Sequence, residues 1–307
     1  MKKVPTVAER ARGALLGTFV GDALGMPFEG ASPGTIPVQL EMVDARLGRG
    51  TYTDDTEMMI VLAESLIADG SVEPALLARR FLERHDPRRG YGAGTLRVFA
   101  HWQDGVSVSD AAALLFGGHG SLGNGAAMRI APVAVLFSSD PERLVEEARR
   151  SAKVTHVHPL GVDGAVAQAV AVGAAMRTEE IVATARAAVE TDEMRRRLDT
   201  VAELLTAPPA NPTTVAEKLG NTSAAALSVP AAIYAACHVD DFRGAVSYAV
   251  RCGGDTDTIG AMTGAIAGAR HGHSEIPSNW VAFLEDGRYG RSHVQRLADR
   301  LAAAASS

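Results

Sequence analysis

Two short clusters of acidic and hydroxyl side chains, far apart in the chain, are the residues best suited to chemistry. One lies in TYTDDTEMM (51–59) and the other in GGDTDTIGAMTGAIAGA (253–269), each at the start of an apolar run. Adjacent carboxylates repel each other unless a cation holds them together. Mg²⁺ and Mn²⁺ prefer oxygen ligands, about six in an octahedron. The two clusters offer such an all-oxygen set: Thr53, Asp54, Asp55, Asp255, Asp257 and Thr258.

The spacing within each cluster predicts how its acids are presented. Neighbouring residues on a helix point about 100° apart, so Asp54 and Asp55 could flank one ion or two. Asp255 and Asp257 are two residues apart, which aligns them in an extended chain and predicts a loop that ends near Thr258. A Thr or Asp before a helix is also an ordinary N-cap. Because paired acids exceed what a cap needs, we expect the two clusters to meet in space and share ions.

A phosphatase is the rival interpretation of the second cluster. The letters DTDT (255–258) fit the DxDxT pattern of haloacid-dehalogenase-type enzymes, in which the first Asp attacks phosphorus. That motif requires a buried β-strand immediately before it. The preceding AVSYAVRCGG (245–254) stands late in a chain with little sign of a parallel sheet. A Mg²⁺-dependent phosphatase using Asp255 and Asp257 therefore stays only as an alternative.

A glycine-rich segment, GSLGNGAAMR (120–129), could bind phosphate. Free N–H groups of such a loop, leading into a helix, can cradle a pyrophosphate at the positive end of the helix dipole. A plain turn would have the same composition. Arg129 could be a phosphate ligand or an arginine at the surface or in a salt bridge. The nearby THVHP (155–159) lacks the third ligand of a zinc site, so His158 is expected in the core or at a helix cap.

Helices must position these residues, because the apolar pattern repeats with a helical period and alternating strand patterns are nearly absent. The segments 162–177 and 223–237 are apolar on most faces, which is typical of helices at the centre of an all-α fold. The proline-containing APPANPTT (207–214) is the best candidate for a domain boundary. It is short and the second acidic cluster follows it. We therefore predict a single all-α domain over residues 1–307.

Composition narrows the class of protein. The chain has 307 residues, of which 47% are hydrophobic and 21% charged, enough for a substantial core. Its net charge of -6 lacks the basic excess of a nucleic-acid-binding protein, so no direct nucleic-acid binding is expected. Cys237 and Cys252 are the only cysteines, as expected in a reducing compartment. Charges interrupt the apolar N-terminal stretch, and the longest nearly uncharged runs (164–176 and 224–237) are shorter than the ~20 residues of a membrane span. These features predict a cytoplasmic protein with no membrane segment.

Several segments, in order along the chain, resemble the ADP-ribosylglycohydrolase family, which includes the dinitrogenase-reductase-activating glycohydrolases. Besides the two acidic clusters they are GALLGTFVGDALGMPFEG (13–30), RGYGAGTLRVF (89–99), GSLGNGAAMRIAPV (120–133), THVHPLGVDGAVAQAVAV (155–172) and LGNTSAAALSVPAAIYAA (219–236). The middle three are especially similar to the ADP-ribosylhydrolase 3 subgroup. The resemblance runs from about Arg10 to Arg270. It implies a single compact domain of orthogonally packed helices. The resemblance also implies a hydrolase with two divalent cations, Mg²⁺ or Mn²⁺, that removes ADP-ribose from modified proteins.

Position by position, the resemblance assigns both acidic clusters to the metal ions. Glu29 matches the family's mobile acidic residue, and Glu29 and Asp55 are the candidates for the catalytic proton donor or acceptor. Eight positions match ADP-ribose contacts: Tyr91 and Gly92 in the cleft wall, Phe116 on adenine, Ser121, Gly123, Asn124 and Gly125 around the diphosphate and its ribose, and His156 near the ligand. Leu122 departs from the closest subgroup, which tends to have an aromatic residue there.

The resemblance implies hydrolysis of an O- or N-glycosidic bond at C1 of the ADP-ribosyl ribose. The substrate would be an ADP-ribosylated protein or a small ADP-ribosyl compound, and ADP-ribose would be the product. The letters RGYGAG and GNGAAMR favour serine-linked or other O-linked substrates, while arginine, a second ADP-ribose unit and an acetyl ester stay open as acceptors. A catalytically silent relative that binds ADP-ribose is the remaining alternative.

Overall fold

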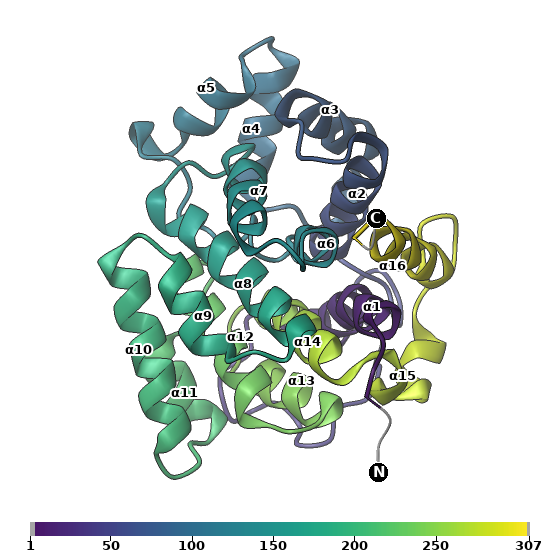
Figure 1. Ribbon diagram of the computed structural model, residues 1–307, viewed down its shortest axis with the longest axis vertical. Helices are drawn as coiled ribbons and strands as arrows, with labels where there is room; N and C mark the ends of the chain where they lie inside the picture. Colours follow the sequence, from purple (N-terminus) through teal and green to yellow (C-terminus); the bar gives the residue numbers. More distant parts are fainter. Residues whose placement is uncertain (1–3, 306–307) are drawn as a thin grey trace.

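The protein is built from helices, and segments far apart in the sequence lie together at its centre (Figure 1). The computed structural model describes residues 4–305. Within that range it contains no β-strand, only an isolated bridge between Gly123 and Ala224. The predicted all-α fold class is confirmed.

The α-helices, in chain order, are α1 (Val7–Gly25), α2 (Asp54–Asp69), α3 (Pro74–Arg84), α4 (Ala93–Gln103), α5 (Val108–Ala113), α6 (Ala131–Leu136), α7 (Pro141–Lys153), α8 (Pro159–Arg177), α9 (Ile181–Ala188), α10 (Asp192–Thr206), α11 (Pro212–Leu219), α12 (Ala225–His238), α13 (Phe242–Arg251), α14 (Thr256–His271), α15 (Ser278–Phe283) and α16 (Arg291–Ala305). Short 3-10 helices lie between them: η1 (Met26–Phe28), η2 (Pro87–Arg89), η3 (Leu115–Gly118) and η4 (His273–Glu275).

Local sequence explains many of the helix ends. Thr6 and Glu9 form a capping box at the start of α1, in which each side chain accepts the backbone N–H of the other residue. Prolines occupy the first position of α3, α7, α8 and α11, where a missing N–H leaves no helical bond unmade. Gly70 ends α2 in the left-handed conformation, with a φ of 74°. These signals set limits of α2, which carries the first acidic cluster, and of several other helices.

Helices α1 and α14 form a tightly packed central pair. Gly17 lies against Gly264 and Gly21 against Gly260, and a Cβ at Gly17 or Gly21 would clash with the carbonyl of the glycine opposite. Apolar side chains of both helices belong to one hydrophobic core that also includes residues of α2, α8, α12 and α16. The close approach places the C-terminal end of α1 beside the N-terminal end of α14, where the second acidic cluster begins.

The other helices surround this pair. In Figure 1, α2 to α5 lie towards one end, α9 to α11 lie towards the opposite end, and α8 crosses between them. Helix α8 contacts α7, α9, α12 and α14. Within residues 4–305 it is the one helix long and apolar enough to cross a membrane, and 89% of its most apolar stretch is buried in the fold. Such burial is that of a central core helix.

Two sequence-based alternatives are resolved by the fold. The possible boundary at 207–214 covers the connection between α10 and α11 and the first turn of α11, and both of these helices pack against α12. The residues on its two sides therefore share one core. The segment before Asp255 is helix α13 and a turn, with no strand. The phosphatase alternative is wrong, because its nucleophile requires a strand at that place.

Candidate active site

One cavity, with a volume of about 770 Å³, contains side chains of both acidic clusters and the glycine loop. Its volume is in the range of small-molecule sites. The carboxyl-bearing residues in its lining are Glu29, Asp54, Asp55, Asp255 and Asp257. Segments from the two ends of the sequence therefore meet in one place, as an ion shared between the clusters requires.

The first cluster occupies the N-terminal end of α2. Asp54 and Asp55 are the first two helical residues, 9% and 2% exposed, and both line the cavity. Thr53 is the N-cap, and its Oγ1 accepts a hydrogen bond from the Asp55 N–H (3.3 Å). Unlike the two acids, Thr53 is not part of the cavity lining. Its contacts are those of a helix cap. The position of Thr53 therefore does not support its predicted role as a metal ligand, which stays a prediction.

The second cluster starts α14 instead of ending a loop. Asp255 is the N-cap, and Asp257 and Thr258 lie in the first helical turn. The expected loop ending near Thr258 is wrong, because the helix already begins at Thr256, whose hydroxyl donates to the Gly25 carbonyl (2.8 Å). Asp255, Asp257 and Thr258 nevertheless all line the cavity.

The aspartates of the cavity repel one another. Burial and the neighbouring aspartates raise the pKa of Asp54 to about 8. The same causes raise the pKa of Asp55 and that of Asp257 well above the usual range of a carboxyl group. The positive charge of Arg46 opposes this increase at Asp54, with a smaller effect than burial or Asp22. In the metal-free protein these three carboxyl groups therefore favour the neutral, protonated form, and a bound cation would favour the ionised form.

The donor set fits divalent cations. The Oδ2 atom of Asp55 is buried without a hydrogen-bond partner, and hard cations take such carboxylate oxygens as ligands. Among residues 4–305, no three His, Cys, Asp or Glu side chains stand close enough to form a ready-made ion cage. Ion binding would therefore require carboxylate side chains to rotate and the Thr258 hydroxyl to contribute.

The metal-free protein is expected to lose stability as the pH rises. In the folded state the pKa of Asp22 is about 6 and that of Asp54 about 8, both raised chiefly by burial. An aspartate in the unfolded chain has a pKa of about 3.9. Between about pH 4 and pH 8 the unfolded chain has therefore released protons that the folded protein retains, so the free energy of unfolding falls as the pH rises. Urea unfolding in EDTA at pH 5 and pH 8 measures this, and Asp54→Asn should reduce the difference. A wild-type difference that Asp54→Asn leaves unchanged would contradict the prediction.

The glycine loop lines the cavity, but it differs from the expected phosphate cradle. The Gly123 N–H donates to the Ser121 Oγ (3.2 Å), and the Asn124 N–H donates to the Ser223 carbonyl (2.8 Å). Since these two amides are occupied, a diphosphate would need other donors of the loop. Residues 125–129 form turns, and the helix that follows, α6, has only 6 residues. The expectation of a helix dipole directly behind the loop is wrong.

Asn124 connects the glycine loop to the second acidic cluster. Its Nδ2 donates to the Asp255 Oδ2 (2.7 Å) and to the Ser228 Oγ (3.1 Å). In this structure the side chain predicted to contact ADP-ribose is therefore a bridge that orients Asp255.

A buried arginine organises the opposite side of the loop. Arg129 is fully buried and donates to the Ser151 carbonyl (3.0 Å) and to the Thr155 Oγ1 (2.9 Å). Of its three predicted roles, the surface position is wrong, and Arg129 is absent from the cavity lining, where a phosphate ligand would lie. The Thr155 hydroxyl lies 2.7 Å from the His156 Nδ1. Because this hydroxyl accepts from Arg129, its own hydrogen can be donated to Nδ1, which leaves Nε2 as the protonated nitrogen. Burial, reinforced by Arg129, lowers the pKa of His156 to about 3, so the imidazole is neutral.

Most of the other predicted ligand positions reach the cavity. The lining includes Gly92, Phe116, Ser121, Gly123, Gly125 and His156. Phe116 is 56% exposed and has a left-handed backbone, with a φ of 50°. Leu122, the departure from the closest subgroup, lines the cavity as well.

Tyr91 is the exception among the predicted ligand positions. It is buried and absent from the cavity lining, and its hydroxyl donates to the Glu57 Oε2 (2.6 Å). Glu57 lies on α2 and also accepts from the Asp86 N–H (3.1 Å). Tyr91 therefore ties the 86–92 segment to the helix of the first acidic cluster. Its neighbours Gly90 and Gly92 line the cavity, and a contact of Tyr91 itself with ADP-ribose stays a prediction.

Comparisons with known proteins agree with this geometry. The model of the family described as ADP-ribosylglycohydrolase matches residues 3–307. The chain belongs to the ADP-ribosylglycohydrolase family. It is 33% identical to the ADP-ribosylhydrolase ARH3 of Mus musculus over 324 aligned residues, which cover 90% of this chain and 87% of that protein. It is 30% identical to the ADP-ribosyl-[dinitrogen reductase] glycohydrolase of Rhodospirillum rubrum over 291 residues, 92% of each protein.

A solved structure extends the similarity to three dimensions. An ADP-ribosylglycohydrolase-related protein complex superposes with a TM-score of 0.80 at 31% identity, and the match covers 97% of this chain and 99% of that chain. The predicted family and the prediction of a glycohydrolase enzyme are confirmed. The cavity that joins both acidic clusters is the candidate active site of this glycohydrolase.

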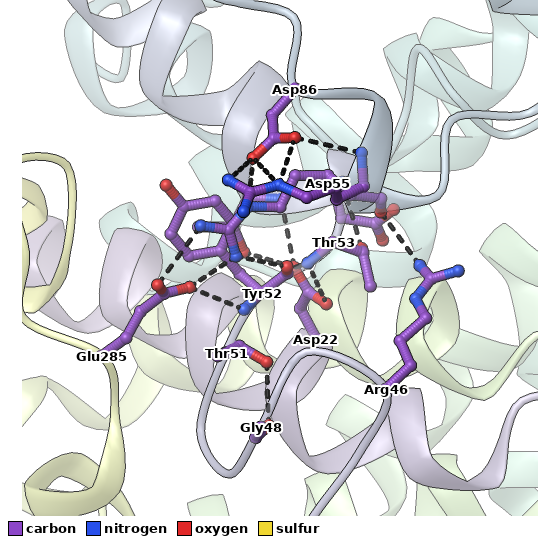
Figure 2. A network of polar contacts seen from close by, with 12 residues as sticks. Asp22, Arg46, Gly48, Thr51, Tyr52, Thr53, Asp55, Asp86 and Glu285 are labelled. Carbon is purple, nitrogen blue, oxygen red and sulfur yellow. Dashed lines mark hydrogen bonds and ion pairs between the residues drawn. The ribbon is translucent and has the colours of Figure 1, made fainter.

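A polar network clamps the segment that enters α2 of the glycohydrolase (Figure 2). Arg89 donates to the Tyr52 carbonyl (2.9 Å) and to Glu285 (2.6 Å), and its guanidinium lies 3.7 Å from the centroid of the Tyr52 ring. Glu285 also accepts from the Tyr52 N–H (3.1 Å). The figure shows this network beside Thr53 and Asp55. The start of α2 is therefore fixed both by the 86–89 turn and by the segment that follows α15.

Three other residues line the glycohydrolase cavity, although the sequence did not assign them to a binding site. Thr222 and Ser223 line it because the Gly123–Ala224 bridge pairs their segment with the glycine loop. His158 is a helix cap, as expected, since its Nδ1 accepts from the Leu160 N–H (3.1 Å), yet it lines the cavity too. Both cases depend on tertiary contacts that no local pattern reveals.

Proposed function

We propose that this glycohydrolase removes ADP-ribose from O-linked acceptors, chiefly serine side chains of proteins, with two divalent cations, Mg²⁺ or Mn²⁺, in the acidic part of its cavity. The observation that carries the proposal is a single cavity lined by five carboxyl-bearing residues, the glycine loop and Phe116. The relatives named above are hydrolases of ADP-ribosyl groups by their descriptions. ADP-ribose contains a ribose diol, a diphosphate and an adenine, and these three groups match the acidic, polar and aromatic parts of the cavity wall.

The cations would be held by the two aspartate pairs. Asp54, Asp55, Asp255 and Asp257 supply the carboxylates, and the Thr258 hydroxyl lines the same wall. When bound, such ions would hold ribose hydroxyls and make water more nucleophilic. The protein's part is to keep the acids converged and to present the sugar to them, and Asn124 contributes by orienting Asp255.

Proton transfer is assigned to Glu29, with Asp55 as the second candidate. A glycosidic oxygen needs a proton as it leaves, and the attacking water needs a base. Glu29 lines the cavity and is exposed, so it can exchange protons with solvent, whereas Asp55 is 2% exposed. Glu29→Gln should therefore remove one limb of the pH–rate profile while Mn²⁺ still binds. A variant with an unchanged profile would transfer the role to Asp55.

A side chain added to the glycine loop is expected to weaken the binding of ADP-ribose. In Gly123→Ala the new methyl would lie 3.2 Å from the Ser121 Oγ and 3.5 Å from the His156 Nε2, so a small shift of the protein accommodates it. The methyl takes space at the cavity wall, so we expect the Kd for ADP-ribose, measured by calorimetry, to rise about tenfold, a cost of ~1.4 kcal/mol. Gly287→Ala is the matched control, since its Cβ would meet no atom within 4 Å. Equal affinities in both variants would contradict a ligand-binding role of this loop.

A panel of substrates tests the acceptor. Serine-linked and arginine-linked ADP-ribosyl peptides, poly-ADP-ribose and O-acetyl-ADP-ribose would be compared in the presence of Mg²⁺ or Mn²⁺, with ADP-ribose release as the readout. The serine-linked peptide should give the highest kcat/KM. Preference for the arginine-linked peptide would refute the O-linked assignment but not the glycohydrolase. Binding of ADP-ribose without turnover of any substrate would indicate the catalytically silent alternative.

A further inference from the structure

Asp22 is a buried carboxylate beside the active site that belongs to neither acidic cluster. It lies on α1 and has 0% exposure. Its two oxygens accept the Thr53 N–H at 3.1 and 3.0 Å. Its Oδ2 also accepts the Thr56 N–H (3.2 Å) and the Thr56 hydroxyl (2.6 Å). Every one of these donors lies at the start of α2, on either side of Asp54 and Asp55. Figure 2 shows Asp22 beside Thr53.

These hydrogen bonds do more than cap a helix. The N-cap of α2 is Thr53, whose own Oγ1 already accepts the Asp55 N–H. Asp22 adds a second acceptor from a different helix, and free N–H groups at a helix start favour a negative charge. A buried carboxylate needs such partners, because leaving it without hydrogen bonds costs several kcal/mol. The consequence is that the first turn of α2 is tied rigidly to α1.

The same turn of α1 also holds the second acidic cluster. The Gly25 carbonyl accepts the Thr256 hydroxyl (2.8 Å), and Gly25 packs so closely on Thr256 that a Cβ would clash with the backbone. Thr256 stands between Asp255 and Asp257 in the sequence. The last turn of α1 therefore contacts α2 and α14, the two helices that carry the acidic clusters, next to their aspartates.

We propose that Asp22 is a positioning residue of the hydrolytic reaction, which sets the spacing between the Asp54–Asp55 pair and the Asp255–Asp257 pair. It does not line the cavity, so it acts through α2 and not on the substrate. The proposal rests on the proposed function in one respect, namely that the spaced acids hold divalent cations. Outer partners of metal ligands typically contribute about 10–100-fold to metal affinity or activity.

Asp22→Asn is the first test. An asparagine keeps the size but replaces one carboxylate oxygen by an NH2 group and removes the negative charge, so the Thr53 N–H loses one acceptor and the remaining hydrogen bonds to α2 are weakened. We expect kcat for ADP-ribose release to fall about 10–100-fold and the Kd for Mn²⁺ alone, measured by calorimetry, to rise by a similar factor. The KM should change little, because the glycine loop is untouched.

Asp163→Asn is the matched control. Asp163 is also a buried aspartate on a helix, 1% exposed, and it accepts the Glu190 N–H (3.1 and 3.0 Å) and the Thr191 N–H (2.6 Å) at the start of α10. Its loss should lower the melting temperature while kcat and Mn²⁺ affinity stay at the wild-type level. An Asp22→Asn variant that behaves like this control would overturn the positioning role.

Substitutions of Thr56 separate the effect of the hydrogen bonds between Asp22 and α2 from the effect of the negative charge of Asp22. Thr56→Val keeps the Asp22 carboxylate and removes one tether, whereas Thr56→Ser retains the hydroxyl. We expect Thr56→Val to lower kcat and Mn²⁺ affinity and Thr56→Ser to restore both, and equal values for the two would overturn the proposal. This pair also decides the question if Asp22→Asn fails to fold. A wild-type protein that neither binds Mn²⁺ nor releases ADP-ribose would instead contradict the proposed function.

Discussion

Replacing Asp257 by asparagine is expected to reduce the rate of ADP-ribose release at least ~100-fold while the fold is kept. Outer partners of metal ligands alone contribute about 10–100-fold, so a carboxylate that would hold the ion directly should contribute no less. Burial and the nearby Asp255 favour the protonated form of Asp257 in the metal-free protein, and its pKa is raised accordingly. Asparagine resembles that neutral form, so the melting temperature in EDTA should stay constant or increase.

The readout is a single-turnover assay with excess enzyme, paired with calorimetry of Mn²⁺ binding. Asp104→Asn is the control, because Asp104 is exposed at the end of α4 and away from the cavity lining. A substrate such as serine-linked ADP-ribosyl peptide reports on the reaction, and the melting temperature reports on the fold. If Asp257→Asn turned over at the wild-type rate, the assignment of the second cluster to the reaction would be refuted.

The acidic clusters could be recognised in the sequence because their chemistry is unusual. Paired acids before an apolar run exceed what a helix cap needs, and the two clusters do line one cavity. The all-α class followed from helical periodicity and the scarcity of alternating patterns. The apolar segments 162–177 and 223–237 are indeed the central helices α8 and α12.

Other features of the site could not be predicted, because tertiary contacts decide them. Asp255 and Asp257 were expected in an extended loop, whereas the Thr256–Gly25 contact starts a helix there. Arg129 is an ordinary arginine in the sequence, and its burial behind Thr155 depends on how α7 packs. Local sequence indicates the preferences of the backbone, but it does not show which side chains from different helices contact each other.

Chelation of divalent cations should abolish turnover and weaken ADP-ribose binding without unfolding the protein. In EDTA the aspartates of both clusters lose the ions proposed to hold them, and burial then favours protonated forms, as the pKa of about 8 for Asp54 indicates. The hydrophobic core, which runs through α1, α8, α12 and α14, does not depend on those ions. Activity should fall to background in EDTA and return with excess Mg²⁺ or Mn²⁺, and full activity in excess EDTA would refute metal dependence.

Thermal shifts separate the contributions of the two ends of the ligand. A ligand at a hundredfold excess over its Kd stabilises the folded state by about 2.7 kcal/mol, which corresponds to a few degrees in melting temperature for a chain of this size. ADP-ribose with Mn²⁺ should produce that shift, and ADP-ribose in EDTA a smaller one, because its distal ribose then lacks the ions near Asp55 and Asp257. AMP, which has no distal ribose, should give a small shift that EDTA leaves unchanged. Equal shifts for ADP-ribose with and without Mn²⁺ would mean that the sugar is not held at the aspartates, and the cavity's acidic wall would need another explanation.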